Sequence, residues 1–180
     1  CLVVLASPVG DYFAGGAKPL KILIEEHAQR CAPHLGVVKT GGNYAAAMGP
    51  TLAAKKTFGV DQVLFCPGGE VQETGAANFL LIKPGHILTR SLDSTFLHGV
   101  TRESLLVLAK DLGLTTSEER IDFHEVLADI ERGRITEVFG MGTGAVIAPV
   151  ARLGYEGRDI LVNGGEPGPV ARRLFDELTG

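Results

Sequence analysis

The chain has 180 residues, 45% hydrophobic and 21% charged, a composition typical of one globular domain and not of a disordered or fibrous protein. Its formal net charge is −4 and its basic residues are scattered, so no nucleic-acid-binding face is indicated. No apolar run reaches the roughly 18 residues that a membrane-spanning helix requires.

Cysteine and histidine spacing indicates neither a metal site nor a disulfide framework. Cys1, Cys31 and Cys66 are odd in number and form no C-x-x-C pair, which favours a reducing compartment and hence a cytoplasmic protein. The five histidines include no pair at i, i+4 spacing that could hold a metal ion. We therefore expect no metal, no nucleic-acid partner and no membrane partner.

The first half of the chain alternates predicted strands, turns and one long helix. Leu20, Ile22 and Ile24 share one face of a half-buried strand. An alanine-rich stretch predicts a helix that Gly49-Pro50 kinks or interrupts and Gly59 ends. The predicted strands are 2–9, 20–26, 37–39, 61–66, a short piece at 71–73 and a pair within 78–89 joined by a Pro-Gly turn; the helix is 43–58, and 11–19 is a loop.

The second half contains the clearest helix, 101–113, which Gly113 ends and whose apolar stripe is Leu105, Leu108, Ala109 and Leu112. Asp122 and Glu125 flank the next helix start as a capping box does. A strand at 135–144 enters a glycine turn, a strand at 145–150 is stopped by its proline, and 168–180 is helical. Because strands and helices follow no regular β-α-β-α rhythm, we predict one α+β domain with much antiparallel pairing.

Lys39 stands in the stretch GVVKTGGNY. A lysine at a strand end usually extends to solvent. The alternative is a Schiff-base lysine, which desolvation by Val37 and Val38 would leave partly as the free amine at neutral pH. Gly41 and Gly42 would then let the backbone approach a flat bound ring.

Glu73 stands in EVQETGAANF, either as an exposed turn carboxylate or as the partner of a cationic ring nitrogen. Pyridoxal phosphate is an electron sink only while its pyridine nitrogen is cationic, and a nearby carboxylate keeps it so. Gly75, Ala76 and Ala77 would leave room for such a ring.

Two turns are candidate phosphate sites. Val100 and Thr101 open the clearest helix, where free N–H groups and the helix dipole favour an anion. Gly142, Thr143 and Gly144 form a glycine turn after a strand, with a hydroxyl available. In both places an ordinary N-cap or tight turn is the alternative. A dinucleotide-binding turn is disfavoured, because the following AVIAPV does not open a helix.

Taken in order, these motifs resemble those of the branched-chain amino acid aminotransferases, which are fold-type IV pyridoxal-phosphate enzymes. The resemblance covers almost the whole chain, through SPVGDYF, KTGGNY, QETGAANF, LHGVTRESLLVLA, EVFGMGTGAVIAPV and GPVARRLFDELTG. It implies pyridoxal 5'-phosphate as cofactor and transfer of the amino group of Leu, Ile or Val to 2-oxoglutarate. It also implies amino acid and 2-oxo acid substrates, the large cofactor-binding domain of that fold, and a homodimer.

The resemblance further implies a role for each matching residue. Lys39 would form the internal aldimine and move a proton between the substrate α-carbon and the cofactor. Tyr44 would bind the phenolic oxygen and Glu73 the ring nitrogen, with Asn78 in the same motif. The remaining contacts would be Leu97 against the ring, Gly99, Val100, Thr101, Gly142 and Thr143 around the phosphate, and the amides of Thr143 and Gly144 at the substrate carboxylate.

The chain also departs from the family pattern. The stretch APHLGVVK before the lysine is altered and one residue shorter than usual, and His98 stands where proline is usual. We expect residues 1–180 to be the large domain alone, without the N-terminal small domain that supplies an arginine to the phosphate, and to have little or no turnover. Two alternatives stay open: another fold-type IV enzyme, such as a D-amino acid aminotransferase or aminodeoxychorismate lyase, and an inactive domain that binds a phosphate ligand.

Overall fold

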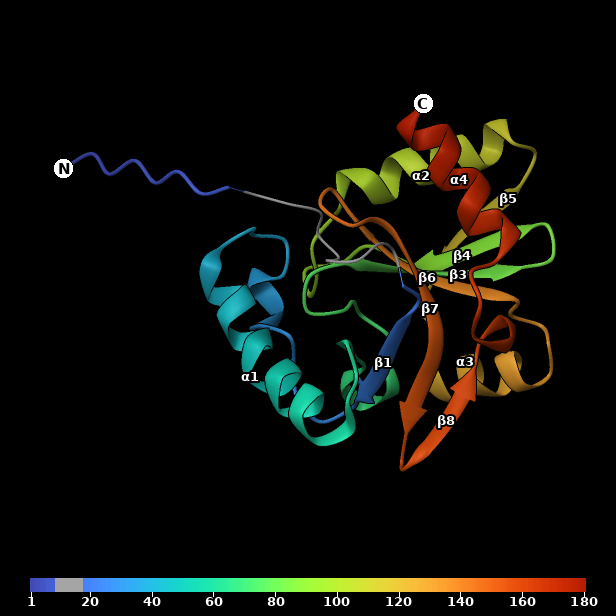
Figure 1. The fold of residues 1–180 in the computed structure, drawn as a ribbon, viewed down its shortest axis with the longest axis horizontal. Helices are drawn as coiled ribbons and strands as arrows, with labels where there is room; N and C mark the ends of the chain where they lie inside the picture. The colour runs from blue at the N-terminus through green and yellow to red at the C-terminus, as the bar shows by residue number, and fades with distance from the viewer. Residues whose placement is uncertain (9–17) are drawn as a thin grey trace.

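The structure is a computed structural model that describes residues 1–8 and 18–180 (Figure 1). In the described part, one mixed sheet carries helices on both faces. Most of the predicted loop at 11–19, and with it much of the SPVGDYF motif, lies outside the described residues. None of the described helices is both long and apolar enough to cross a membrane.

The eight strands are β1 (Leu20–Glu25), β2 (Gln62–Phe65), β3 (Asn78–Lys83), β4 (His86–Arg90), β5 (Thr115–Glu119), β6 (Glu137–Gly142), β7 (Val146–Tyr155) and β8 (Arg158–Leu161). Their order is β2-β1-β7-β6-β3-β4-β5, with β8 paired to β7. The pairs β3–β4, β3–β6, β6–β7 and β7–β8 are antiparallel, and β1–β2, β1–β7 and β4–β5 are parallel. The predicted α+β class with much antiparallel pairing is confirmed.

The helices are α1 (Gly41–Phe58), α2 (Val100–Asp111), α3 (Phe123–Glu131) and α4 (Pro169–Thr179), with short 3-10 turns at Pro33–Leu35, Pro67–Gly69 and Asn163–Gly165. Local sequence accounts for several of their ends. Gly59 ends α1 in the left-handed region at φ 62, where glycine carries no Cβ penalty. The Asp122 carboxylate accepts the N–H groups of His124 and Glu125 and so caps α3, as predicted.

Strand β3 shows how the layers are joined. Phe79 and Leu81 pack in the core cluster that contains the buried side chains of α3. Leu80 and Ile82 point the other way, into the cluster formed with α2 and α4. Since both faces of β3 are covered, its sequence is a continuous apolar run (Figure 1). The segment just before this rigid strand contains Glu73, so the core holds that part of the chain in place.

Three of the predicted strands are absent. Residues 2–8 form no strand, and Leu2 and Leu5 are 89% and 93% exposed. Residues 37–39 lie in a turn, because the preceding Pro33–Leu35 reverses the chain before any pairing can start. Residues 71–73 are not a regular strand: Gln72 and Glu73 exchange backbone hydrogen bonds with Phe65 of β2, and the isolated bridges Leu64–Thr74 and Glu70–Asp122 flank them. For residues 2–8 and 37–39 the reason is the lack of a neighbouring strand in the described part of the chain, because an apolar run becomes a strand only where a partner can take its N–H and C=O groups.

Neither of the two prolines interrupts its element. Helix α1 continues through Pro50, whose missing N–H leaves the carbonyl of the exposed Ala46 without the donor that a helix normally supplies. Strand β7 continues through Pro149, since its pairing with β1 begins only at Val150 and requires no N–H there. The short strands β5 and β8 were not predicted at all.

Candidate functional site

A cavity of about 440 Å³ opens where the turns before α1 and α2 meet the β6–β7 turn. Its volume lies in the range of small-molecule sites. All of the predicted site residues line it: Lys39, Tyr44, Glu73, Asn78, Leu97, Gly99, Val100, Thr101, Gly142, Thr143 and Gly144. The other lining residues are Arg30, Ala76, Ala77, His98, Met141 and Ala145. Folding therefore gathers positions that are far apart in the sequence around one space.

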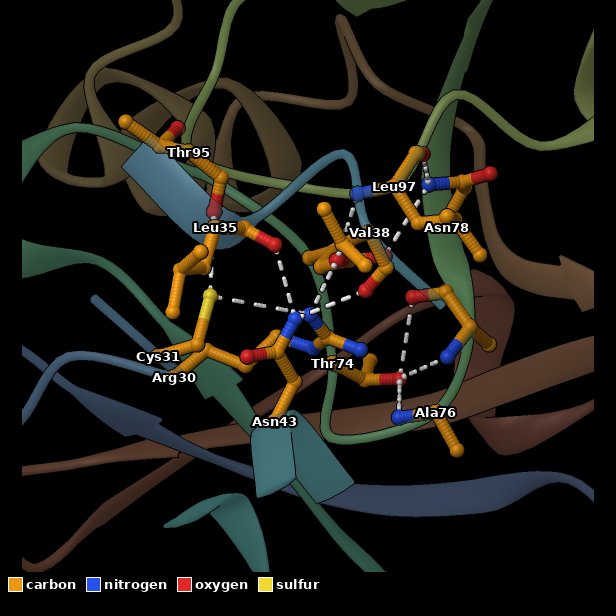
Figure 2. Close-up of polar contacts among 12 residues, drawn as sticks. Arg30, Cys31, Leu35, Val38, Asn43, Thr74, Ala76, Asn78, Thr95 and Leu97 are labelled. Carbon is orange, nitrogen blue, oxygen red and sulfur yellow. Dashed lines mark hydrogen bonds and ion pairs between the residues drawn. The ribbon is translucent and has the colours of Figure 1, made fainter. Parts of the chain in front are cut away.

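The Glu73 carboxylate is the centre of a buried hydrogen-bond network. Its Oε1 accepts the backbone N–H of Leu97 at 2.9 Å and lies 3.0 Å from Nη1 of Arg30. Its Oε2 accepts Nδ2 of Asn78 at 3.1 Å. The same Asn78 amide donates to the Leu97 carbonyl at 2.8 Å (Figure 2). Glu73 and Asn78 together fix the backbone of Leu97 against the start of β3.

Burial is the main influence on the charge of Glu73, which is 2% exposed. It raises the pKa of the Glu73 carboxyl from 4.5 to about 7, because a carboxylate loses its hydration in this position. The Arg30 guanidinium and the Leu97 N–H act in the opposite direction, since both stabilise the anion. The carboxyl can therefore change its charge near neutral pH.

Lys39 lies in a different environment, in the turn formed by residues 31–40, which we call the lysine turn. Val37 and Val38 are 43% and 47% exposed, and Lys39 is itself exposed. The expectation that these valines desolvate the lysine is therefore wrong. It failed because the segment is a surface turn, where neither valine faces a core, and not a strand.

Asn43 holds the lysine turn in shape. Its buried Nδ2 donates to the carbonyls of Leu35 and Val38, both at 2.8 Å (Figure 2). Its backbone N–H donates to the Thr40 carbonyl at 3.1 Å. The asparagine of GGNY thus fastens the first turn of α1 to the backbone on both sides of Lys39.

The lysine turn also contacts residues 91–99, which we call the cradle loop. The Gly36 N–H donates to the Ser94 carbonyl at 3.0 Å. A Cβ on Gly36 would overlap the backbone of Thr95 and Phe96, so only glycine allows this approach. A Cβ on Gly41 or Gly42 would meet nothing within 4 Å, so no other part of the described chain requires glycine there.

Two buried arginines hold the cradle loop in place. Arg90 donates to the Asp93 carboxylate at 2.6 Å, and Asp93 accepts the Thr95 N–H at 2.8 Å. Arg102, 1% exposed, donates to the Arg90 carbonyl at 2.9 Å and pairs with Glu118. These contacts hold the start of α2 at the edge of the cavity.

The start of α2 offers free donors to the cavity. Gly99 is its N-cap and no side chain caps the helix. The first N–H that reaches a helical carbonyl is that of Glu103, which donates to Gly99. A Cβ on Gly99 would overlap Oδ1 of Asn78, so glycine is required at this point. The amides of Val100 and Thr101 and the hydroxyl of Thr143 form a donor set suited to an anion.

Among the charged side chains that line the cavity in the described part of the chain, Arg30 was not predicted from the sequence. Its side chain is 2% exposed, and its guanidinium carbon lies 5.5 Å from the centroid of the Tyr44 ring. No local pattern marks it, since its partner Glu73 follows far along the chain. A signal could have come only from asking which cation balances Glu73.

A metal centre has no support in the part of the chain that is described. Residues 1–8 and 18–180 contain no group of three or more His, Cys, Asp or Glu side chains placed to hold an ion. The charged side chains that line the cavity are Arg30, Lys39 and Glu73, with His98 as a further titratable group at the rim.

A family model and the curated relatives that match this chain are all of aminotransferases. The family model described as amino-transferase class IV matches residues 2–153. A probable branched-chain-amino-acid aminotransferase of Staphylococcus epidermidis is 40% identical over 99% of this chain and 51% of its own length. One from Streptomyces coelicolor is 43% identical over 98% of this chain and 49% of its length. The chain thus spans about half the length of the curated relatives it matches.

Solved structures agree with these sequence matches. The branched-chain amino acid aminotransferase of Thermobaculum terrenum, in its PLP-form, superposes with a TM-score of 0.75 at 25% identity. The superposition covers 89% of this chain and 50% of that one.

Proposed function

The chain belongs to the amino-transferase class IV family, and from this premise we propose that its cavity binds pyridoxal 5'-phosphate and serves the transfer of an amino group from Leu, Ile or Val to 2-oxoglutarate. The observation that carries the proposal is the arrangement of charges and donors around one cavity. It has a buried carboxylate, an amine and a set of uncapped amides.

The residues present fit this cofactor. The Glu73 carboxylate lies at the buried side of the cavity, as a cationic ring nitrogen requires. The uncapped amides at the start of α2 and the Thr143 hydroxyl suit a phosphate group. The small Ala76 and Ala77 line the space between and leave room for a flat ring. When bound there, the cofactor would supply an electron sink for the bond broken at the substrate α-carbon.

The side chains would divide the work in the following way. Glu73 would hold a positive charge at the ring nitrogen, and Tyr44 would bind the ring oxygen. Leu97 would pack against the ring and orient it. Val100, Thr101 and Thr143 would hold the phosphate, and Nζ of Lys39 would carry a proton from the substrate α-carbon to the cofactor. The amides of Thr143 and Gly144 would bind the substrate carboxylate.

The same proposal includes the larger assembly. Residues 1–180 would be the large cofactor-binding domain of the enzyme, acting in a cytoplasmic homodimer. The match over about half the length of the relatives supports the domain part of this proposal.

Absorption spectroscopy tests the proposal directly. Adding pyridoxal 5'-phosphate to the protein should produce a near-visible band that Lys39→Ala abolishes and the control Lys56→Ala, an exposed residue of α1, leaves intact. Glutamate formation from 2-oxoglutarate with Leu as donor then tests the substrate class, on a chain that carries a small domain as well, because little turnover is expected of residues 1–180 alone. The absence of a band in the wild type would overturn the cofactor assignment. A band with turnover of D-alanine and not of Leu would favour the other fold-type IV enzymes.

A further inference from the structure

Arg30 contacts two of the residues expected to bind polar atoms of the cofactor ring. Its Nη1 lies 3.0 Å from Oε1 of Glu73, and its guanidinium carbon lies 5.5 Å from the centroid of the Tyr44 ring. The resemblance assigned Glu73 to the ring nitrogen and Tyr44 to the ring oxygen. One cation therefore touches both side chains, although it comes from a loop to which no function was assigned.

The burial of Arg30 needs an explanation. Its side chain is 2% exposed, and burying a cation is costly unless an anion and hydrogen bonds compensate. Glu73, also 2% exposed, is that anion. The Nε atom of Arg30 has no hydrogen-bond partner among the described residues. The guanidinium is thus less than fully satisfied, and its contact with the carboxylate accounts for its place in the fold.

The contacts divide unequally between the two oxygens of Glu73. Oε1 accepts the Leu97 N–H and forms the ion pair with the Arg30 guanidinium. Among the described residues, Oε2 accepts a hydrogen bond only from the Asn78 amide. A carboxylate oxygen has two acceptor positions. Oε2 therefore retains the capacity to accept one further N–H donor from the cavity side.

Other titratable groups face the same cavity. Lys39, Tyr44 and His98 line it together with Arg30. Of these, Arg30 is the one in ion-pair contact with the carboxylate. Burial favours the neutral form of Glu73, and the guanidinium opposes this effect.

We propose that Arg30 is a positioning residue for the cofactor ring: its guanidinium orients the Glu73 carboxylate and favours its ionised form, with Oε2 directed to the ring nitrogen. The proposal rests on the proposed function, because it assigns Glu73 to that nitrogen. A neutral Glu73 could not balance a cationic ring, so loss of Arg30 should weaken cofactor binding most at neutral pH. Raising the pH should restore part of it by ionising Glu73 without help.

The test compares Arg30→Met and Arg30→Lys with the wild type. Arg152→Met is the matched control, since Arg152 pairs with Asp159 in the β7–β8 hairpin and does not line this cavity. Affinity for pyridoxal 5'-phosphate is measured from pH 6 to 9. We expect Arg30→Met to lose about fivefold at pH 7, because a rise of one pH unit in the ionisation midpoint of Glu73 lowers its ionised fraction from about a half to about a tenth, and to recover at pH 9. Arg30→Lys and Arg152→Met should stay within about twofold of the wild type.

A second measurement uses the protein without cofactor. The ionisation of Glu73 is followed by carboxyl carbon NMR, with Glu73→Gln identifying the signal. The midpoint should move upward by about one pH unit or more in Arg30→Met and hardly at all in Arg30→Lys. Arg30→Met added to Glu73→Gln should cost little further affinity, because the arginine acts through the carboxylate.

The outcomes separate the two proposals. If the wild type does not bind the cofactor, the proposed function is overturned, and the role of Arg30 with it. If the wild type binds and Arg30→Met matches it across the pH range, only the role of Arg30 is overturned. An unshifted Glu73 midpoint in a folded Arg30→Met protein would overturn that role as well. Should Arg30→Met not fold, the same readouts on Arg30→Gln decide.

Discussion

Glu73 and Lys39 face the same cavity from very different surroundings. The carboxylate is 2% exposed and is held by Arg30, Asn78 and the Leu97 N–H. The lysine belongs to an exposed turn whose backbone carbonyls accept hydrogen bonds from the Asn43 side chain. The acid is thus controlled by burial and paired charge, whereas the amine is placed by backbone geometry and stays open to reactants. Substitutions around Glu73 and substitutions around Lys39 should therefore change the stability of the protein by different amounts and for different reasons.

The largest effect should follow loss of the buried carboxylate. Glu73→Ala leaves the Arg30 guanidinium buried without its anion, which should lower the free energy of unfolding by about 3–5 kcal/mol. Urea unfolding measures it. As a control, Glu131→Ala removes the exposed partner of Arg158 and should cost less than about 1 kcal/mol. Equal, small losses in both variants would contradict the contrast between the two environments.

The pH dependence of stability should show the same carboxyl. Because folding raises the pKa of Glu73 from 4.5 to about 7, the native state binds this proton more tightly than the unfolded chain does. The resulting stabilisation is complete below pH 4.5 and is lost as pH rises to about 7, by roughly 3 kcal/mol in total.

The measurement is the difference in free energy of unfolding between the wild type and Glu73→Gln as a function of pH. Since glutamine does not titrate, other groups cancel in this difference. A difference that rises with pH, or stays flat between pH 4.5 and 7, would refute the assigned direction of the shift.

The contact between the lysine turn and the cradle loop should be next in size. Gly36→Ala places a methyl group against the backbone of Thr95 and Phe96 and should cost about 1–3 kcal/mol. The matched control is Gly41→Ala, where the methyl group meets nothing within 4 Å and should stabilise the helix start by about 0.4–1 kcal/mol. Thermal unfolding distinguishes the two variants, because the melting temperature should fall in Gly36→Ala and rise in Gly41→Ala. A stabilised Gly36→Ala would disprove the close approach.

The smallest effect should come from the support of Lys39. Asn43→Ala removes two hydrogen bonds to backbone carbonyls and should cost about 1–2 kcal/mol. It should also slow reductive trapping of pyridoxal 5'-phosphate on Lys39, because the amine is no longer held in place. Asn163→Ala removes one exposed bond to the Glu166 carbonyl and serves as the control. Unchanged trapping in Asn43→Ala would show that the turn keeps its shape without this amide.

The elements that could be predicted are those whose signal is local. The β3–β4 pair follows from two apolar runs around Pro-Gly, and the α3 cap from Asp122 placed before an apolar stripe. Predictions failed where a neighbouring strand decides whether a segment forms or continues a strand. Residues 2–8 have strand composition but no strand to pair with, and Pro149 is tolerated because the pairing with β1 starts one residue later.

The same division holds for the candidate site. The motif residues could be predicted to converge, and they line one cavity. The environment of Lys39 was predicted wrongly, because exposure of Val37 and Val38 depends on how the turn meets the rest of the fold. Arg30 was missed, because only its ion pair with Glu73 in the folded chain marks it as part of the site.

By itself the sequence determined the α+β class, most helices and strands, and a set of side chains that line one cavity. These depend on periodicity, turn residues and motifs, which act over short distances along the chain. Only the tertiary structure decided that Arg30 faces Glu73, that Asn43 holds the lysine turn and that Gly36 touches the cradle loop. Burial and ion pairing are properties of segments brought together from distant parts of the chain, so no local pattern contains them.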